Sequence, residues 1–343
     1  MKVPSILLAI CLAATLFLGA CARTATTPPR PAAEAPITAK GEAAGDRLIV
    51  FYAASLALPF KYLEQAFERG HLGVDMQGES SGSQTACRKI TELNRECDVI
   101  SSADYEVIEQ LLIPDHASWF IIFARNAEVI AYTDKSKYGD EVNAQNWYRV
   151  LLRPDVRVGR CDPNLAPEGY RTLLTWQLAD IYYKDDLKGE KVSDKLLAAV
   201  RKEHVTQSVT ELLPLLESMA LDYAFMYKSV AMQHNLRFVT LPPQIDLSSE
   251  QYLDFYRQAK VEVTGKKPGE TMTMVGAPIL YGITIPNGAP HPELAMDFVR
   301  LLLSKKGQEA LRKGFQEPTV PALAPNVSAV PEELRPLVKQ AEI

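Results

Sequence analysis

From residue 48 onward, short apolar runs typical of buried strands alternate with longer amphipathic segments typical of helices. The runs 48–52 and 98–100 have the first pattern, and between them Leu56, Phe60 and Phe67 fall on one helical face. A strand, a crossover helix and a second strand normally form a parallel pair that is covered on both faces. The sequence therefore predicts an α/β fold with mostly parallel sheets flanked by helices.

Two strand-like segments far apart in the sequence, 128–133 and 280–285, enclose a further set of α/β elements. The enclosed segments are strands at 156–159 and 223–227 and helices at 169–183 and 210–219. After residue 285, one long amphipathic helix is expected over 292–315. The simplest arrangement has two lobes joined by the two enclosing strands. We expect lobe I to contain 47–130 and 280–343 and lobe II to be inserted as 131–279. Such lobes close around a ligand in the cleft between them.

The amino terminus has the pattern of a secretion signal. Lys2 precedes an apolar run over 6–18, which ends in Leu18-Gly19-Ala20-Cys21. The run is too short to span a membrane and resembles a signal peptide with a lipobox over 1–21. We expect Cys21 to be lipidated and the Pro/Ala/Thr-rich stretch 22–46 to be a disordered tether. The chain would then be anchored outside the cytoplasm, in a periplasm or at the cell exterior; an ordinary cleaved signal is the alternative.

Three cysteines remain beyond this segment. Cys87 and Cys97 could pair, which would leave Cys161 free, or all three could be buried thiols. No CxxC or histidine-rich spacing indicates a zinc or haem site, and we expect no cofactor and no metal held directly. The net charge of −5 argues against nucleic acid or an anionic membrane surface as a partner. Local dipoles would have to hold an anionic ligand.

Small and hydroxyl residues occupy four strand-to-helix junctions, which are 53–56, 80–83, 162–169 and 207–210. A helix start exposes unpaired amides and a partial positive charge, and both favour an anion. A serine at one such position is normally just a helix cap. Four junctions spread over both lobes predict instead an oxyanion site without lysine or arginine.

Two other functions fit parts of the sequence. Gly78-Glu79-Ser80-Ser81-Gly82 matches the nucleophile elbow of a lipid-anchored serine hydrolase. Of the candidate histidines, His291 lies in what looks like a solvent-facing turn, and His204 and His234 have no evident acid partner. Tyr223 and Tyr227 would share one face of a strand and could ligate ferric iron, but no matching His, Asp or Glu set accompanies them.

From about Leu48 to the carboxyl end, the chain resembles the molybdate/tungstate-binding proteins of ABC transporters, in particular the archaeal-type tungstate-binding branch. The segments that carry the resemblance are 101–105 (SSADY), 119–126 (WFIIFARN), 131–136 (AYTDKS), 146–148 (NWY), 169–171 (GYR), 222–231 (DYAFMYKSVA) and 318–322 (PTVPA). The family fold is the two-lobed, type II periplasmic-binding-protein fold with the ligand between the lobes. The resemblance implies a monomeric, non-enzymatic solute-binding protein that delivers molybdate or tungstate to an ABC permease.

The resemblance also implies which residues meet the oxyanion. They are Ala54, Ser55 and Ser83 in lobe I and Glu168, Val209 and Tyr227 in lobe II. Ser55 and Ser83 would contribute hydroxyls and amides, and Tyr227 its hydroxyl. Ala54, Glu168 and Val209 would contribute backbone amides.

The chain departs from the tungstate branch at two positions. That branch adds two carboxylates to the metal, where this chain has Ala166 and Val209. We therefore expect the anion to stay four-coordinate and to be held by hydrogen bonds alone. Whether the Glu168 carboxylate takes part is left open at this stage.

Overall fold

The computed structural model describes residues 46–267 and 269–341. The predicted signal peptide, Cys21 and nearly all of the tether lie outside the described residues. Among the helices that the structure describes, none is long and apolar enough to cross a membrane.

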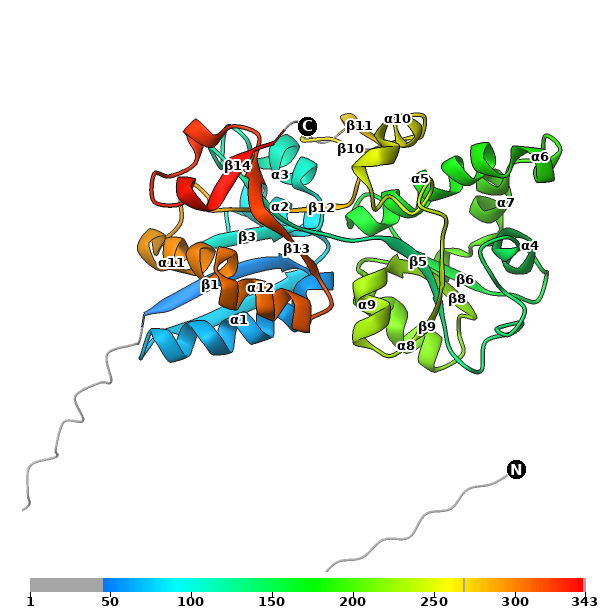
Figure 1. Cartoon of the computed structure of the whole chain (residues 1–343), viewed down its shortest axis with the longest axis horizontal. Coiled ribbons are helices and arrows are strands. Elements are labelled where there is room, and N and C mark those ends of the chain that lie inside the picture. Colours follow the sequence, from blue (N-terminus) through cyan, green and yellow to red (C-terminus); the bar gives the residue numbers. More distant parts are fainter. Residues whose placement is uncertain (1–45, 268, 342–343) are drawn as a thin grey trace, which may run out of the picture. The chain divides into compact units, whose positions relative to one another are not determined.

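A seven-stranded sheet is built from the two ends of the described chain (Figure 1). Its strands, in the order β14-β13-β4-β12-β3-β1-β2, are β14 (Val338–Gln340), β13 (Glu317–Ala324), β4 (Ile121–Arg125), β12 (Leu280–Thr284), β3 (Val99–Ser102), β1 (Arg47–Ala53) and β2 (Asp75–Ser81). The helices of this lobe are α1 (Ala57–Gly70), α2 (Ser83–Thr91), α3 (Tyr105–Leu112), α11 (Pro292–Leu303) and α12 (Lys305–Lys313).

These helices cover both faces of the sheet. Val50 belongs to the same apolar cluster as Phe60 and Phe67 of α1, whereas the next residue, Phe51, belongs to a cluster with Ile90 of α2. Successive side chains of a strand point to opposite faces of its sheet. Helices α1 and α2 therefore lie on opposite faces, as the sequence pattern predicts.

A second sheet of five strands forms the other lobe (Figure 1). In the order β7-β6-β8-β5-β9, its strands are β7 (Val205–Thr206), β6 (Val158–Cys161), β8 (Tyr223–Tyr227), β5 (Glu128–Tyr132) and β9 (Arg237–Thr240). The helices between them are α4 (Trp147–Leu151), α5 (Pro167–Tyr182), α6 (Lys184–Leu187), α7 (Val192–Ala199), α8 (Leu212–Glu217) and α9 (Lys228–Gln233), and α10 (Leu253–Tyr256) follows β9. A separate hairpin pairs β10 (Lys260–Thr264) with β11 (Thr271–Val275).

The α/β class is confirmed, but both sheets are mixed where mostly parallel sheets were expected. Strand β12 runs antiparallel to both β3 and β4, and β5 runs antiparallel to β8 and β9. Strand β4 leaves the first lobe and β12 returns to it, so the two neighbours must run in opposite directions. The double crossing between the lobes thus accounts for the antiparallel β4–β12 pair.

The chain changes sheets between two strands. Strand β4 ends at Arg125, and β5 begins at Glu128 in the other sheet, which leaves Asn126 and Ala127 as the connection. Residues 128–130, which the sequence analysis assigned to lobe I, therefore pair with β8 and β9 in the second sheet. The first connection is a short hinge.

The predicted long helix over 292–315 is two helices, α11 and α12. Ser304 separates them with an extended backbone, and its hydroxyl caps α12 by accepting a hydrogen bond from the amide of Gly307. A Cβ atom at Gly307 would lie 2.1 Å from the carbonyl oxygen of Leu302, so only glycine fits this tight bend. The apolar periodicity continues across the break, and for that reason the pattern alone predicts one helix.

Candidate functional site

The cavity that we take as the candidate functional site lies where both lobes bring strand-to-helix junctions together. It is lined by Ala53, Ala54, Ser55, Ser81, Gly82, Ser83, Ala103, Ala166, Pro167, Glu168, Ser208, Val209 and Tyr227. All six residues that the resemblance singled out are among them. No lysine or arginine belongs to this set.

The first lobe contributes the carboxyl ends of adjacent parallel strands. Strands β1 and β2 are in register up to Ala53 and Ser81, and β3 follows on the other side of β1. Parallel strands end at the same edge of a sheet, so the helices that follow them begin side by side. The start of α2 and the short 3₁₀ helix Ala54–Leu56 consequently face the same cavity.

The helix starts around the cavity lack the side-chain caps that serine at such positions normally provides. Their N-cap residues are Ala53, Gly82, Ala166 and Ser208, and no side chain of the four accepts a hydrogen bond from a backbone amide of the first turn. The Ser208 hydroxyl donates to the Glu211 side chain instead. At the neighbouring helix α3, by contrast, Asp104 accepts a hydrogen bond from the amide of Glu106. The first amides of the four uncapped segments therefore remain available to an anion.

The Ser83 hydroxyl is oriented by its neighbour Ala103. Its oxygen accepts a hydrogen bond from the Ala103 amide at 3.0 Å. A hydroxyl that accepts from the protein keeps its own proton for donation. Ser83, which is buried, can therefore donate into the cavity.

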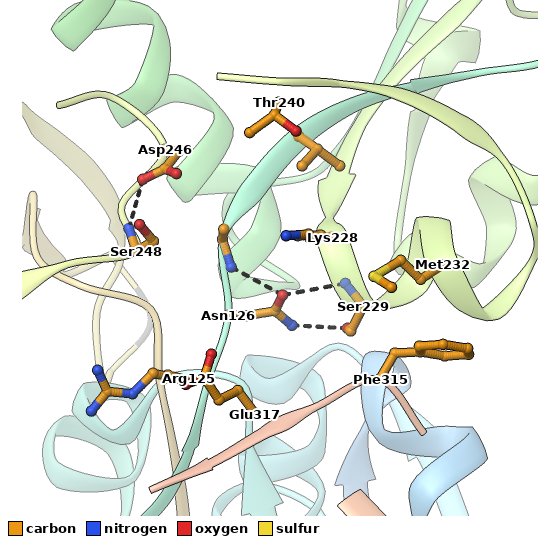
Figure 2. A pocket seen from close by; sticks show the side chains of 12 residues that line it. Arg125, Asn126, Lys228, Ser229, Met232, Thr240, Asp246, Ser248, Phe315 and Glu317 are labelled. Carbon is orange, nitrogen blue, oxygen red and sulfur yellow. Dashed lines mark hydrogen bonds between the residues drawn. The ribbon is translucent and has the colours of Figure 1, made fainter. Parts of the chain in front are cut away.

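The Ser55 hydroxyl stands at the end of a chain of donors that begins at the hinge. The Asn126 side-chain amide donates to the Tyr281 hydroxyl at 3.0 Å, and the hydroxyls of Tyr281 and Ser55 are 2.9 Å apart. Either hydroxyl can be the donor of this bond, and the arrangement in which Tyr281 donates to Ser55 leaves the Ser55 proton for the cavity. Ser229 holds Asn126 in place (Figure 2). The Asn126 carboxamide donates to the Ser229 hydroxyl and accepts from the Ser229 amide.

The Tyr227 hydroxyl is buried in the cavity wall and makes no hydrogen bond to the protein. Its residue is 1 % exposed, and its ring packs edge-on against Tyr281, with 6.0 Å between ring centroids. Burial raises the pKa of this phenol well above its ordinary value, so it stays a neutral donor. Because it lines the cavity, this hydroxyl is free to donate to whatever occupies the cavity, whether water, an ion or a ligand.

The Glu168 carboxylate is directed away from the cavity, into lobe II. One oxygen accepts from the Cys161 amide at 3.2 Å, and the other accepts from the Thr172 hydroxyl at 2.8 Å. Proline at position 167 begins α5, so the Glu168 amide lies in the first turn, where amides have no partner within the helix. Glu168 therefore offers the cavity its amide.

A second buried carboxyl, Glu128, shares the Thr172 hydroxyl with Glu168. Burial, followed by repulsion from Glu168, raises the pKa of Glu128 well above its ordinary value. Burial also raises the pKa of Glu168. Burial and mutual repulsion therefore oppose the ionisation of both carboxyls together.

The two positions where the tungstate branch has metal-binding carboxylates, Ala166 and Val209, both line the cavity and carry no carboxylate here. Glu211, which directly follows the 207–210 junction, accepts hydrogen bonds from the Ser208 hydroxyl and the Gln207 amide and does not line the cavity. Across residues 46–267 and 269–341, no group of three or more His, Cys, Asp and Glu side chains could hold a metal ion.

The structure separates the residues of the two alternative sites. Ser80 is exposed on β2, and in the described part of the chain no histidine bonds to it; His291 instead bonds to Asp98 at 3.1 Å. Tyr223 donates to the Lys137 carbonyl oxygen, away from the cavity that Tyr227 lines. Neither a catalytic triad nor a tyrosine pair for iron is assembled.

The three described cysteines are free and buried, so Cys87 and Cys97 are not bridged. Burial raises the pKa of the Cys87 thiol to about 12, which keeps it protonated and unreactive.

A larger hollow of ≈ 400 Å³ lies beside Asn126 and Ala127, the connection between the lobes (Figure 2). It mixes Arg125 and Lys228 with Asp246 and Glu317, and none of the described unpartnered buried atoms points into it. The cavity at the strand-to-helix junctions is the better candidate because it contains the buried Tyr227 hydroxyl, which has no protein partner.

Sequence reasoning missed seven lining residues. Six of them flank predicted residues within the same four junctions. Ala103 belongs to a fifth junction, between β3 and α3, inside the segment SSADY that carries part of the resemblance. The signal was present there, but no single residue of that segment indicated contact with a ligand.

Comparisons with known proteins show the family and the fold. Residues 48–316 match the family of bacterial extracellular solute-binding proteins. An uncharacterized solute-binding protein of Petrotoga mobilis is 45 % identical over 292 residues, which cover 85 % of this chain and 90 % of that protein. The molybdate/tungstate-binding protein WtpA of Pyrococcus abyssi is 40 % identical over 318 residues, with 86 % and 91 % covered. The solved periplasmic molybdate-binding protein of Azotobacter vinelandii has a TM-score of 0.54 at 17 % identity, with 78 % of this chain and 98 % of that chain covered, and supports the two-lobed fold.

Proposed function

The chain belongs to the family of bacterial extracellular solute-binding proteins, and on that premise we propose that it captures molybdate or tungstate between its lobes. The observation that carries the proposal is the buried Tyr227 hydroxyl, which has no protein partner and faces a cavity rimmed by uncapped helix starts. The names of similar proteins, such as the WtpA protein of Pyrococcus abyssi, support the choice of anion.

The proposed cage consists of donors only. Ser55, Ser83 and Tyr227 would give hydroxyl protons, and Ala54, Glu168 and Val209 would give amide protons. Each hydrogen bond to a charged oxygen is worth about 1.5–3 kcal/mol once water is excluded. Converging neutral donors can therefore hold a dianion without a lysine or arginine.

The same cage would select its anion by size and protonation. Sulfate and phosphate are smaller than molybdate, so fixed donors would fit them less well. Phosphate carries a proton at neutral pH for part of its population, and a cage of donors offers that proton no acceptor. Molybdate and tungstate are nearly equal in size and charge, and we expect similar affinities for both.

We further propose that the bound anion stays four-coordinate and is passed unchanged to an ABC importer. The absence of carboxylates at Ala166 and Val209 and the inward turn of the Glu168 side chain support hydrogen bonding alone. Anchoring through Cys21 would keep the protein at the outer face of the membrane, as a monomer beside its permease.

Calorimetric titration of the purified protein with molybdate, tungstate, sulfate and phosphate tests the proposal. We expect one site per chain, tight binding of the first two anions and weak binding of the others. Equal affinity for sulfate would refute the size argument, and absence of heat with all four anions would refute the function.

A further inference from the structure

A buried ion pair joins the two lobes beside the cavity. Arg171 in α5 of the second lobe donates to a carboxylate oxygen of Asp104, which follows β3 in the first lobe. The Tyr170 hydroxyl donates to the same oxygen at 2.7 Å. Asp104 and Arg171 are 0 % and 1 % exposed, whereas the other described ion pairs have at least one partner that reaches solvent.

Both ends of this ion pair continue into walls of the cavity. Asp104 follows Ala103, which lines the cavity and donates its amide to Ser83. Arg171 lies three residues, or about one helical turn, after Glu168, which lines the cavity from the other lobe. The ion pair therefore fixes the distance between two walls that carry proposed ligand contacts.

The lobes also approach backbone to backbone at a second point. A Cβ atom on Gly82 would lie 2.1 Å from the Leu165 carbonyl oxygen of the other lobe. Gly82 has φ −62° and ψ 145°, which any residue can adopt, so a side chain there would clash only across the lobes. Nearby, Gln84 and Arg88 of α2 donate to the carbonyls of Pro163 and Asn164.

We propose that Asp104, Tyr170 and Arg171 form an interlobe latch that sets how long the bound oxyanion is retained. This inference rests on the function proposed above. When the lobes are in contact, removing one charge leaves its partner buried and unpaired, which is strongly unfavourable. When the lobes separate, water solvates both groups, so the same change costs little. Loss of the latch therefore destabilises only the closed arrangement and speeds release.

Asp104→Asn is the sharpest test, because asparagine still caps α3 but removes the charge. We expect the dissociation rate and the Kd for molybdate to rise at least about tenfold, as measured by stopped-flow fluorescence and calorimetry. Tyr170→Phe, which deletes one hydroxyl, should raise the Kd severalfold and serves if the first variant folds poorly. Gly82→Ala should weaken binding while leaving each lobe folded.

Asp222→Asn is the matched control. Asp222 is equally buried, but it accepts from the backbone and side chain of Arg157 within the second lobe. It should lower the Tm and leave the Kd for molybdate within about twofold of wild type, since it does not join the lobes. A wild-type Kd and dissociation rate in Asp104→Asn would overturn the latch.

Small-angle X-ray scattering separates failure of the latch from failure of the proposed function. We expect Asp104→Asn to have a larger radius of gyration than wild type in the same buffer. If the wild-type protein binds none of the oxyanions, the proposed function fails, and the scattering alone decides the latch. Equal radii would then overturn it.

Discussion

Replacing Tyr227 by phenylalanine removes one oxygen atom and changes little else. The ring keeps its packing against Tyr281, and no protein hydrogen bond is lost because the hydroxyl has none. If its partner is the anion, the variant loses one charge-assisted hydrogen bond, which is worth about 1.5–3 kcal/mol. That loss corresponds to a rise in Kd of about 10- to 150-fold.

The same substitution weakens binding but should not lower the stability of the unliganded protein. A buried hydroxyl without a partner costs about 1–3 kcal/mol, so its removal should leave the free energy of unfolding unchanged or raise it. Calorimetry with molybdate and urea denaturation without it measure the two quantities. An unchanged Kd, or weaker binding that merely follows a loss of stability, would refute the assignment of Tyr227 to the site.

Other substitutions test the remaining parts of the account. Ser55→Ala and Ser83→Ala should each raise the Kd for molybdate about tenfold or more, because each removes one donor to a charged oxygen; wild-type calorimetry would exclude the residue concerned. Glu168→Gln should leave the Kd nearly unchanged if only the amide serves, and a large loss would indicate a carboxylate role. Glu128 has a raised pKa in the folded state, so its contribution to stability is complete below its ordinary value of 4.5 and declines as the pH rises toward the raised pKa. Glu128→Gln should flatten that decline in urea denaturation between pH 5 and pH 9, and identical pH profiles would contradict the assignment.

Much of the fold follows from local patterns. Strands β5, β8 and β12 are buried at every position, and their mostly apolar runs stand out in the sequence. Strand direction leaves no such mark, since antiparallel and parallel central strands have the same composition. The break at Ser304 was hidden for a similar reason, because α11 and α12 continue one apolar stripe.

The parts of the site that depend on short sequence segments could be predicted from the sequence. Small and hydroxyl residues at uncapped helix starts are visible in the sequence, and so the residues around Ser55 and Ser83 could be identified. The direction of the Glu168 side chain depends on Thr172 and Cys161, and the pairing of Asp104 with Arg171 joins residues 67 positions apart. Such contacts arise only from the tertiary structure.

Equilibrium dialysis tests the central claim most directly. The purified protein would be dialysed against an equimolar mixture of molybdate, tungstate, sulfate and phosphate, and the retained elements would be measured by inductively coupled plasma mass spectrometry. The account predicts molybdenum and tungsten totalling one atom per chain, with sulfur and phosphorus no higher than in protein dialysed without the anions. Retention of sulfate or phosphate in their place, or of no anion at all, would contradict it.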